Sequence, residues 1–250
     1  MKPVFFAQVL MKYQVQYFEC PQCDFVQSEE PYWLDESYSI AINEEDTGIM
    51  KRNIQSCNVV LATLLLLGKT KGKVVDYAGG YGILVRLLRD EGVDAFWYDR
   101  YCENLVARGF EFSGEMAELA TAFEAFEHFV EPMKELDSIF GISKNILFST
   151  LLIPQPAPPT DQWWYYGFEH GQHISFFREK TLRFIAKKYD KVLISDGFSH
   201  HLFTDATISY FLWKVLSKYR FITENIKQIT LTSKTFSDHK YIISNKQKEK

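Results

Sequence analysis

The chain has 250 residues, of which 46% are hydrophobic, 24% charged and 16% aromatic, and it carries a formal charge of −4 at pH 7. These proportions exclude disordered and fibrous classes, and an acidic chain without a basic stripe disfavours nonspecific nucleic-acid binding. Four cysteines, no hydrophobic leader and no apolar run near the ~20 residues that span a bilayer favour a cytoplasmic protein without a membrane partner.

Residues 1–46 are expected to form a separate β extension. Val4–Val9 and Tyr13–Phe18 are rich in β-branched and aromatic residues, which favours a β-hairpin. Cys20 and Cys23 follow with the C-x-x-C spacing of one zinc knuckle, in which two thiolates on a tight turn share a tetrahedral ion. One pair does not complete such a site, so these cysteines are candidate ligands of a degenerate knuckle.

The remaining residues, 47–250, are expected to form one α/β domain. Apolar residues recur at helical spacing from Ile49 to Leu67, and Gly68 ends that helix. Apolar β-type runs then alternate with helical segments, which is typical of a parallel sheet covered on both faces. We therefore predict a doubly wound, mostly parallel, Rossmann-like sheet of seven strands. The strands are expected at 73–77, 95–98, 110–112, 119–126, 145–153, 191–195 and 241–244, and further helices at 83–89, 132–140, 179–189 and 210–221.

A long loop is predicted after the fifth strand. Four prolines between Pro154 and Pro159 exclude regular structure there, and the loop runs to about Phe177. Long loops at the carboxyl edge of such a sheet are common binding regions. The aromatic run Trp163–Tyr166 is expected either to form a stacking wall for a sugar or planar acceptor or to pack on itself as a lid.

The segment from Lys73 to Leu84 carries the most information about function. An apolar strand runs into small residues and then a helix, so a ligand can approach the helix N-terminus. The dinucleotide pattern G-x-G-x-x-G fails because its third glycine would fall on Val85. Asp76 at the strand end would repel a pyrophosphate but attract a cationic ligand. Asp99 ends the next strand, where a carboxylate can accept from both hydroxyls of a ribose. Alternatively, the glycines make an ordinary turn and Asp99 caps the next helix.

This segment resembles the first motif of the class I S-adenosylmethionine-dependent methyltransferases, D/E-x-G-x-G-x-G. Asp76, Ala78, Gly80 and Gly82 match it, and Ala78 in place of the first glycine narrows the backbone freedom without excluding the turn. The resemblance covers about residues 50–195 and implies S-adenosylmethionine as the cofactor, with the glycines around its methionine moiety, the second carboxylate on the ribose and the two residues after it beside the adenine. The cofactor-binding residues assigned on this basis are Asp76, Tyr77, Ala78, Gly79, Gly80, Gly82, Asp99, Arg100, Tyr101, Phe123, Glu124 and Glu127.

Thr121–His128, followed by Pro132, is similar to the family's fourth strand, which ends in a Glu-His pair. The alternative is that Glu127 and His128 only cap the helix that begins at Pro132. Both interpretations remain open from the sequence.

Methyl transfer from a sulfonium is an in-line displacement, so the enzyme must align the acceptor, exclude water and remove a proton from a hydroxyl or amine. Histidine is the natural proton acceptor near neutral pH. We expect His173 to face the acceptor, with His170 and His128 behind it; the alternative is that these histidines are caps or satisfied core groups. His200 and His201 are weaker candidates.

The segment His173–Phe177 resembles the H-I-S-F-F segment of a methyltransferase subgroup associated with sugars and surface glycans. That subgroup carries a zinc-binding N-terminal extension in which a further C-x-x-C precedes the one matched here. The 19 residues before Cys20 contain no cysteine, which indicates a lost half-site, so we do not expect zinc to be a required cofactor.

The sequence therefore predicts a methyltransferase that uses S-adenosylmethionine and acts on a small-molecule or sugar acceptor. An NAD-dependent oxidoreductase or epimerase on a related sheet is one alternative, and a degenerate, non-catalytic module with the same fold is another. The acceptor, the methylated atom and the oligomeric state do not follow from the sequence.

Overall fold

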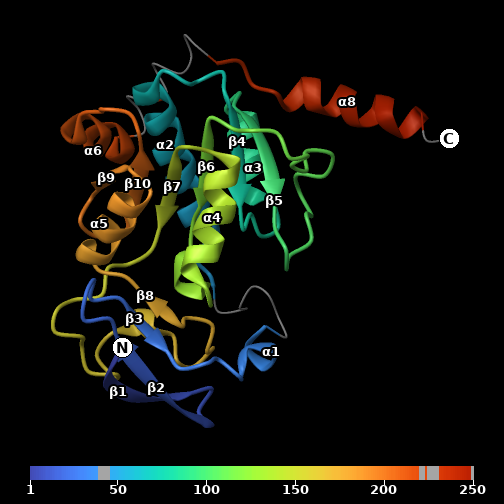
Figure 1. Ribbon diagram of the computed structural model, residues 1–250. Coiled ribbons are helices and arrows are strands. Elements are labelled where there is room, and N and C mark those ends of the chain that lie inside the picture. The colour runs from blue at the N-terminus through green and yellow to red at the C-terminus, as the bar shows by residue number, and fades with distance from the viewer. Residues whose placement is uncertain (39–45, 220–222, 224–230, 249–250) are drawn as a thin grey trace. The chain divides into compact units, whose positions relative to one another are not determined.

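The computed structural model describes residues 1–38, 46–219, 223 and 231–248, whose elements are drawn in Figure 1. These residues belong to two compact units. The first contains Met1–Glu45, Ala122–Ser138 and Leu147–Asp205, and the second contains Asp46–Thr121, Ile139–Ile146 and Ala206–Lys250. The first unit thus joins the N-terminal residues to two later segments of the chain. The domain boundary between residues 46 and 47 stays a prediction.

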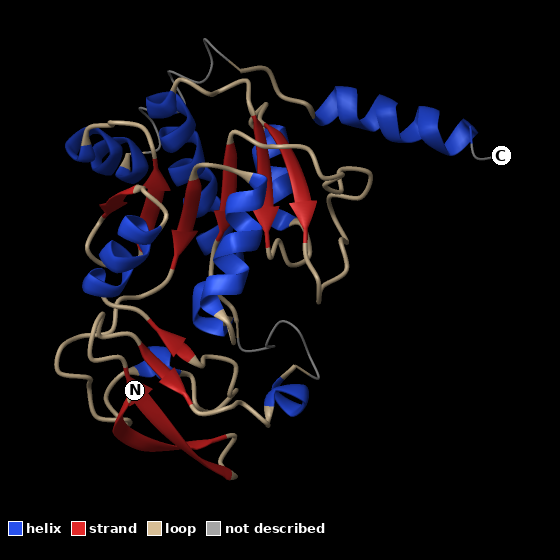
Figure 2. Cartoon of the chain, viewed as in Figure 1, coloured by secondary structure: helices blue, strands red, loops and turns tan. Residues whose placement is uncertain are grey.

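The N-terminal part of the first unit is an antiparallel sheet in the order β1-β2-β3-β8. The predicted hairpin is confirmed, and Figure 2 shows it as a twisted pair of strands. Residues 21–23 form a turn after the hairpin, in which the Asp24 amide donates to the Cys20 carbonyl over 2.9 Å. The elements here are β1 (Lys2–Val9), β2 (Tyr13–Glu19), β3 (Val26–Ser28), α1 (Leu34–Ser37) and β8 (Ser175–Phe176).

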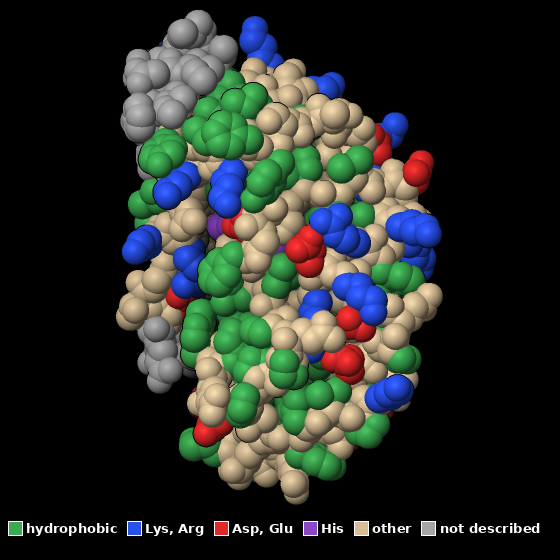
Figure 3. Space-filling view, turned by 90° about the vertical axis from the view of Figure 1, so that its left-hand side faces the viewer, with side chains coloured by type: hydrophobic (Ala, Val, Ile, Leu, Met, Phe, Trp, Pro, Cys, Tyr) green, Lys and Arg blue, Asp and Glu red, His purple; other side chains and the backbone are tan. Residues whose placement is uncertain are grey.

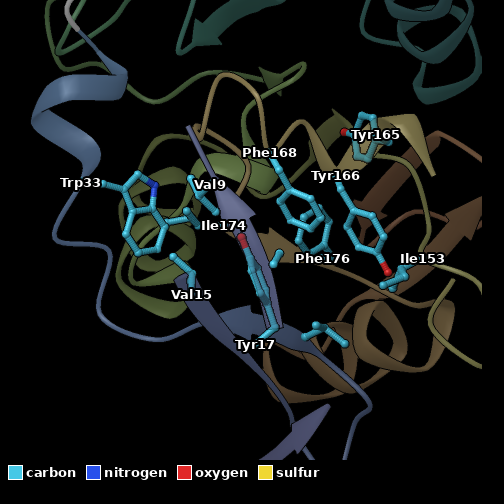
Figure 4. Close-up of a cluster of buried hydrophobic side chains, with 12 residues drawn as sticks. Val9, Val15, Tyr17, Trp33, Ile153, Tyr165, Tyr166, Phe168, Ile174 and Phe176 are labelled. Carbon is cyan, nitrogen blue, oxygen red and sulfur yellow. The ribbon is translucent and has the colours of Figure 1, made fainter. Parts of the chain in front are cut away.

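One apolar core holds this sheet to the segment predicted as a long loop. Figure 4 shows Val15 and Tyr17 from β2 in the same buried cluster as Tyr166 and Phe176 from that segment. The segment itself contains η2 (Trp164–Tyr166) as well as β8. Of its four successive aromatic residues only Trp164 is exposed, at 79%, while the other three pack in or against the core. This favours the self-packing interpretation over a stacking wall.

The larger sheet has six strands among the described residues, in the order β5-β4-β6-β7-β10-β9, where seven are predicted. β4 pairs in parallel with β5 on one side and β6 on the other, and β9 is antiparallel to β10. Four of the five residues of β4 are buried, as expected for a parallel strand with neighbours on both sides. The strands are β4 (Lys73–Tyr77), β5 (Asp94–Tyr98), β6 (Leu119–Ala122), β7 (Ile146–Ser149), β9 (Val192–Ser195) and β10 (His200–Thr204).

The strand predicted at 241–244 is wrong, because these residues belong to the helix α8 (Thr235–Lys248). Three apolar residues in a row are too few to reveal a period. A partner distant in the sequence helps to fix the helix: Asp238 in its first turn accepts hydrogen bonds from the Arg89 guanidinium over 2.7 and 2.8 Å. Both side chains are about 5% exposed.

Three other strand predictions needed adjustment. Residues 110–112 pair with β5 only through one bridge between Trp97 and Glu111. The strands predicted at 119–126 and 145–153 end earlier, at Ala122 and Ser149, because irregular backbone follows both. β10 was not predicted, since two histidines open it and its buried residues do not alternate with exposed ones.

The predicted helices are confirmed with small shifts of their ends, except that the last two residues of the predicted helix 210–221 lie outside the described residues. α2 (Ile49–Leu67) ends at Gly68, whose φ of +66° is the left-handed conformation that favours glycine. α2 packs against α3 and α6 in the second unit, where the Trp213 indole donates to Thr63 Oγ1 over 2.9 Å.

None of the described helices combines the length and the apolar character that a membrane span requires. The other helices are α3 (Ile83–Asp90), α4 (Pro132–Ile142), α5 (Glu179–Lys188) and α6 (Tyr210–Lys218).

Candidate functional site

The glycine turn of the second unit lies between the end of β4 and the start of α3. Ala78, Gly80 and Gly82 all have positive φ, at +62°, +53° and +86°. The alanine therefore adopts the left-handed conformation that a glycine would adopt more easily. A Cβ on Gly82 would lie 2.6 Å from Asn104 Oδ1 and 3.0 Å from the Ala107 Cβ, so glycine is required there for space as well as for conformation.

Asp76 is buried directly beneath this turn. It is 4% exposed, and Thr121 Oγ1 donates to its Oδ1 over 2.6 Å. Burial raises the pKa of Asp76, the Thr121 hydroxyl opposes this shift and the charge of Asp99 adds to it, so that the pKa is about 7. The two carboxylates thus lie close enough to interact, and a cation between them would stabilise the ionised form of both.

Asp99 closes the turn from the end of β5. Its carboxylate accepts from the Gly80 amide over 2.9 Å and from the amides of Tyr101 and Cys102 over 2.7 and 2.9 Å. It does not cap a helix, because none of residues 100–110 is helical. Trp97, two residues earlier, donates from its indole to the Gly80 carbonyl over 2.8 Å. The backbone amide and carbonyl of Gly80 are therefore both hydrogen-bonded to side chains at the end of β5.

The residues assigned to the adenine lie on the surface after β5. Tyr101 is 82% exposed, and Arg100, also exposed, donates from Nε to the Tyr98 hydroxyl over 3.1 Å. Tyr77 is buried and its ring lies 5.1 Å from that of Tyr98. An adenine could reach Tyr101 from solvent, whereas Tyr77 contributes to the core beneath the turn.

In the first unit, the residues that follow β6 form a tight turn. Glu124 has a φ of +49° and its carboxylate accepts from the Ser149 hydroxyl over 2.5 Å. The Phe123 ring lies 6.2 Å from the His200 ring. The family resemblance assigns both residues to the cofactor, and that assignment stays a prediction.

The histidines predicted as catalytic come together in the first unit. The ring centroid of His173 lies 4.9 Å from that of His128 and 4.8 Å from that of His170. His173 Nδ1 donates to the Tyr165 carbonyl over 2.6 Å, and His128 Nδ1 donates to the Gln172 carbonyl over 3.0 Å. In each neutral ring the Nε2 atom therefore carries the lone pair.

Burial keeps the His128 and His173 rings uncharged. Together with the charge of His170, and against the hydrogen bond to the Gln172 carbonyl, it lowers the pKa of His128 to about 4. Burial and the neighbouring His128 and His170 hold the pKa of His173 well below its ordinary value. His170 has a different role in the loop: its Nδ1 accepts from the Gln172 amide over 3.2 Å. A Cβ on Gly167 would overlap the His170 ring.

Glu127 lies beside the two histidine rings. It is fully buried, and among the described residues neither of its carboxyl oxygens has a hydrogen-bond partner at normal geometry. Burial and the charge of Glu124 raise the pKa of Glu127 to about 8 against the opposing effect of the Tyr165 and Thr150 hydroxyls. One ligand atom each from Glu127, His128 and His173 lies within 4.8 Å of the others. The interpretation of Glu127 as a helix cap finds no support in these contacts.

Cys20 and Cys23 are free thiols in the turn after β2. Burial raises the pKa of Cys23, while the backbone amides of Cys23 and Gln22 outweigh burial and lower the pKa of Cys20. In the part of the chain that the structure describes, the pair belongs to no cluster of three or more metal-ligating side chains. The assignment of Cys20 and Cys23 as candidate ligands of a degenerate knuckle stays a prediction.

The structure adds contacts that sequence analysis did not predict. Trp97 and Thr150 belong to no motif, yet they interact with Gly80 and Glu127. Thr121 and Tyr165 lie in segments that the sequence singles out, but their hydrogen bonds to Asp76 and His173 were not predicted. Trp97 lies two residues before Asp99 along the extended chain, so both side chains point to the same face of the sheet. This spacing is the sequence feature that could have identified Trp97.

Basic and acidic side chains lie interspersed on the face drawn in Figure 3, which therefore carries no basic stripe among its described residues.

Comparison with known proteins gives one family. The model of a methyltransferase domain matches residues 50–195. A search of the curated proteins gives no significant match.

The comparison with solved structures finds methyltransferases of about 14% identity. One is 1,6-didemethyltoxoflavin-N1-methyltransferase from Burkholderia thailandensis, with S-adenosylhomocysteine and 1,6-didemethyltoxoflavin bound (TM-score 0.49, 14% identity, 82% of this chain and 100% of that chain). Another is magnesium protoporphyrin IX methyltransferase from Synechocystis, with S-adenosylhomocysteine bound (TM-score 0.47, 14% identity, 70% and 96%). The family assignment rests on the domain model and on none of these likenesses.

Proposed function

Because the chain belongs to the methyltransferase domain family, we propose that it transfers the methyl group of S-adenosylmethionine to a small-molecule acceptor. The sequence by itself predicts the same enzyme class. The observation that carries the choice of cofactor is the pair of carboxylates at the glycine turn. Asp76 and Asp99 interact across the ends of β4 and β5, and their hydrogen bonds within the described residues come from a hydroxyl and from backbone amides. A ligand with sulfonium and ammonium groups supplies the missing positive charge.

The acceptor and its proton are assigned to the histidine cluster of the first unit. A hydroxyl or amine acceptor must lose a proton during methyl transfer, and a neutral imidazole with a free Nε2 can accept it. His173 is the proposed acceptor-facing residue, with His170 and His128 supporting it. The H-I-S-F-F segment supports a sugar as the acceptor, since it resembles the subgroup associated with glycans.

Calorimetry with S-adenosylmethionine tests the cofactor. We expect binding to the full chain, and an at least tenfold loss of affinity in Asp99→Ala, because the variant removes the carboxylate proposed to hold the ribose. Asp90→Asn is the matched control, since Asp90 is another carboxylate of the second unit and is paired with Arg86 on the surface. No binding at millimolar cofactor would remove the proposal.

A non-catalytic module with the same fold is the second candidate. The hydrogen bonds of Gly80 favour this candidate, because the Gly80 amide and carbonyl are already bonded to the Asp99 carboxylate and the Trp97 indole. An affinity for S-adenosylmethionine that is unchanged in Asp99→Ala would support this candidate. Nothing in the glycine spacing favours a dinucleotide cofactor.

A further inference from the structure

We infer that Glu127, His128 and His173 form a binding site for a divalent transition-metal ion, with zinc as the best match. One ligand atom from each lies within 4.8 Å of the others, and all three residues belong to the first unit. Two histidines and one glutamate are a known zinc donor set that leaves a coordination position open. The inference goes beyond the proposed function, since a cation could bind here whether or not a methyl group is transferred.

The first argument is the state of the Glu127 carboxyl. It is fully buried, and both oxygens lack a hydrogen-bond partner at normal geometry within the described part of the chain. A buried polar group without a partner is costly, because it loses its bonds to water and gains none in return. The other carboxylate that acts on it, Glu124, has the same sign. A cation bound to Glu127 would remove this cost.

The second argument is the orientation of the imidazoles. Ligand histidines in metal sites usually donate their other ring N–H to a backbone carbonyl or carboxylate, which fixes the tautomer and the ring plane. His128 and His173 both do so, through Nδ1 to the carbonyls of Gln172 and Tyr165. The Gln172 and Tyr165 carbonyls therefore fix the plane of each ring and place its proton on Nδ1 before any ion binds.

The third argument is the spacing. Ligand atoms around a tetrahedral zinc ion lie about 3.4 Å apart, because zinc–nitrogen bonds are about 2.0–2.1 Å long. The separations here are at most 4.8 Å, so side-chain movements of about 1 Å are enough to complete the coordination. With an ion bound, the lone pair of His173 would be shared with the metal, so metal binding and proton acceptance by His173 would exclude each other.

The test is metal binding by the full chain in a Cys20→Ser/Cys23→Ser background, which removes the thiolate pair as a competing site. We expect one equivalent of Zn²⁺ by calorimetry, and a Co²⁺ visible spectrum without a thiolate charge-transfer band. Glu127→Gln should weaken Zn²⁺ binding at least tenfold, and His128→Gln and His173→Gln should each abolish it. His200→Gln is the matched control, because His200 is another partly buried histidine of the first unit and should leave binding unchanged.

Two outcomes would overturn the site: loss of all metal binding in the cysteine double variant, or unchanged Zn²⁺ affinity in His173→Gln. Circular dichroism and urea unfolding verify the folding of each variant. Affinity for S-adenosylmethionine is measured on the wild type, because the family resemblance assigns Glu127 to the cofactor. Metal binding without cofactor binding would refute only the proposed function, and cofactor binding without metal binding would refute only the metal site.

Discussion

Asp76→Asn is expected to stabilise the unliganded protein above neutral pH and to weaken cofactor binding at the same time. Asp76 is 4% exposed, and burial raises its pKa to about 7, against an ordinary value of 3.8. The asparagine side chain has nearly the same shape and can still accept the hydrogen bond from Thr121 through its amide oxygen. The substitution therefore removes the buried charge while keeping the packing.

The sign and size of the effect come from proton binding. Between about pH 4 and about pH 7 the unfolded chain has lost this proton while the folded chain keeps it, so the free energy of unfolding falls as the pH rises. The two pKa values correspond to a loss of up to about 4 kcal/mol, at about 1.36 kcal/mol for each pH unit. The amide introduced by Asp76→Asn does not titrate, so this loss should be absent in the variant.

Urea unfolding of wild type and variant from about pH 4 to about pH 8 measures the difference. We expect the two proteins to have similar stability near pH 4 and the variant to gain progressively up to about 4 kcal/mol above pH 7. Glu127→Gln serves as a comparison, because Glu127 is a second buried carboxyl with a raised pKa. A stability difference between wild type and Asp76→Asn that does not change with pH would refute the reasoning. At about pH 8 the same variant should bind S-adenosylmethionine more weakly, because the negative charge that attracts the cofactor is gone.

Three further substitutions test single contacts. Ala78→Gly should change stability by less than about 1 kcal/mol, because relief of the left-handed alanine offsets the entropy cost of glycine, and a larger loss in urea unfolding would contradict this. Asp238→Ala should destabilise the protein by about 3 kcal/mol or more, because it leaves the buried Arg89 guanidinium without its main partner; calorimetric unfolding that matches wild type would refute the role of this pair. Gly167→Ala should displace the His170 ring, which its new methyl group would overlap, and an unchanged histidine NMR spectrum would count against the described loop.

The sequence by itself determined the local features of this protein. Strand β4, the glycine turn and α3 were predictable because an apolar run, small residues and a helical period follow one another within about 20 residues. The hairpin β1–β2 and the stop at Gly68 were predictable for the same reason, since each depends on neighbours in the chain. The motif residues Asp76 and Asp99 follow from their positions at strand ends.

Only the tertiary structure decided the environment of the candidate site. Contacts between residues 45 and more positions apart bury Asp76 with Thr121, fix α8 through Arg89 and bring His173 to His128. Burial in turn determines the pKa of each group and whether a polar atom has a partner, as the carboxyl of Glu127 illustrates. The sequence shows that these groups can titrate or bind a ligand, but solvent exclusion by distant segments sets their charge.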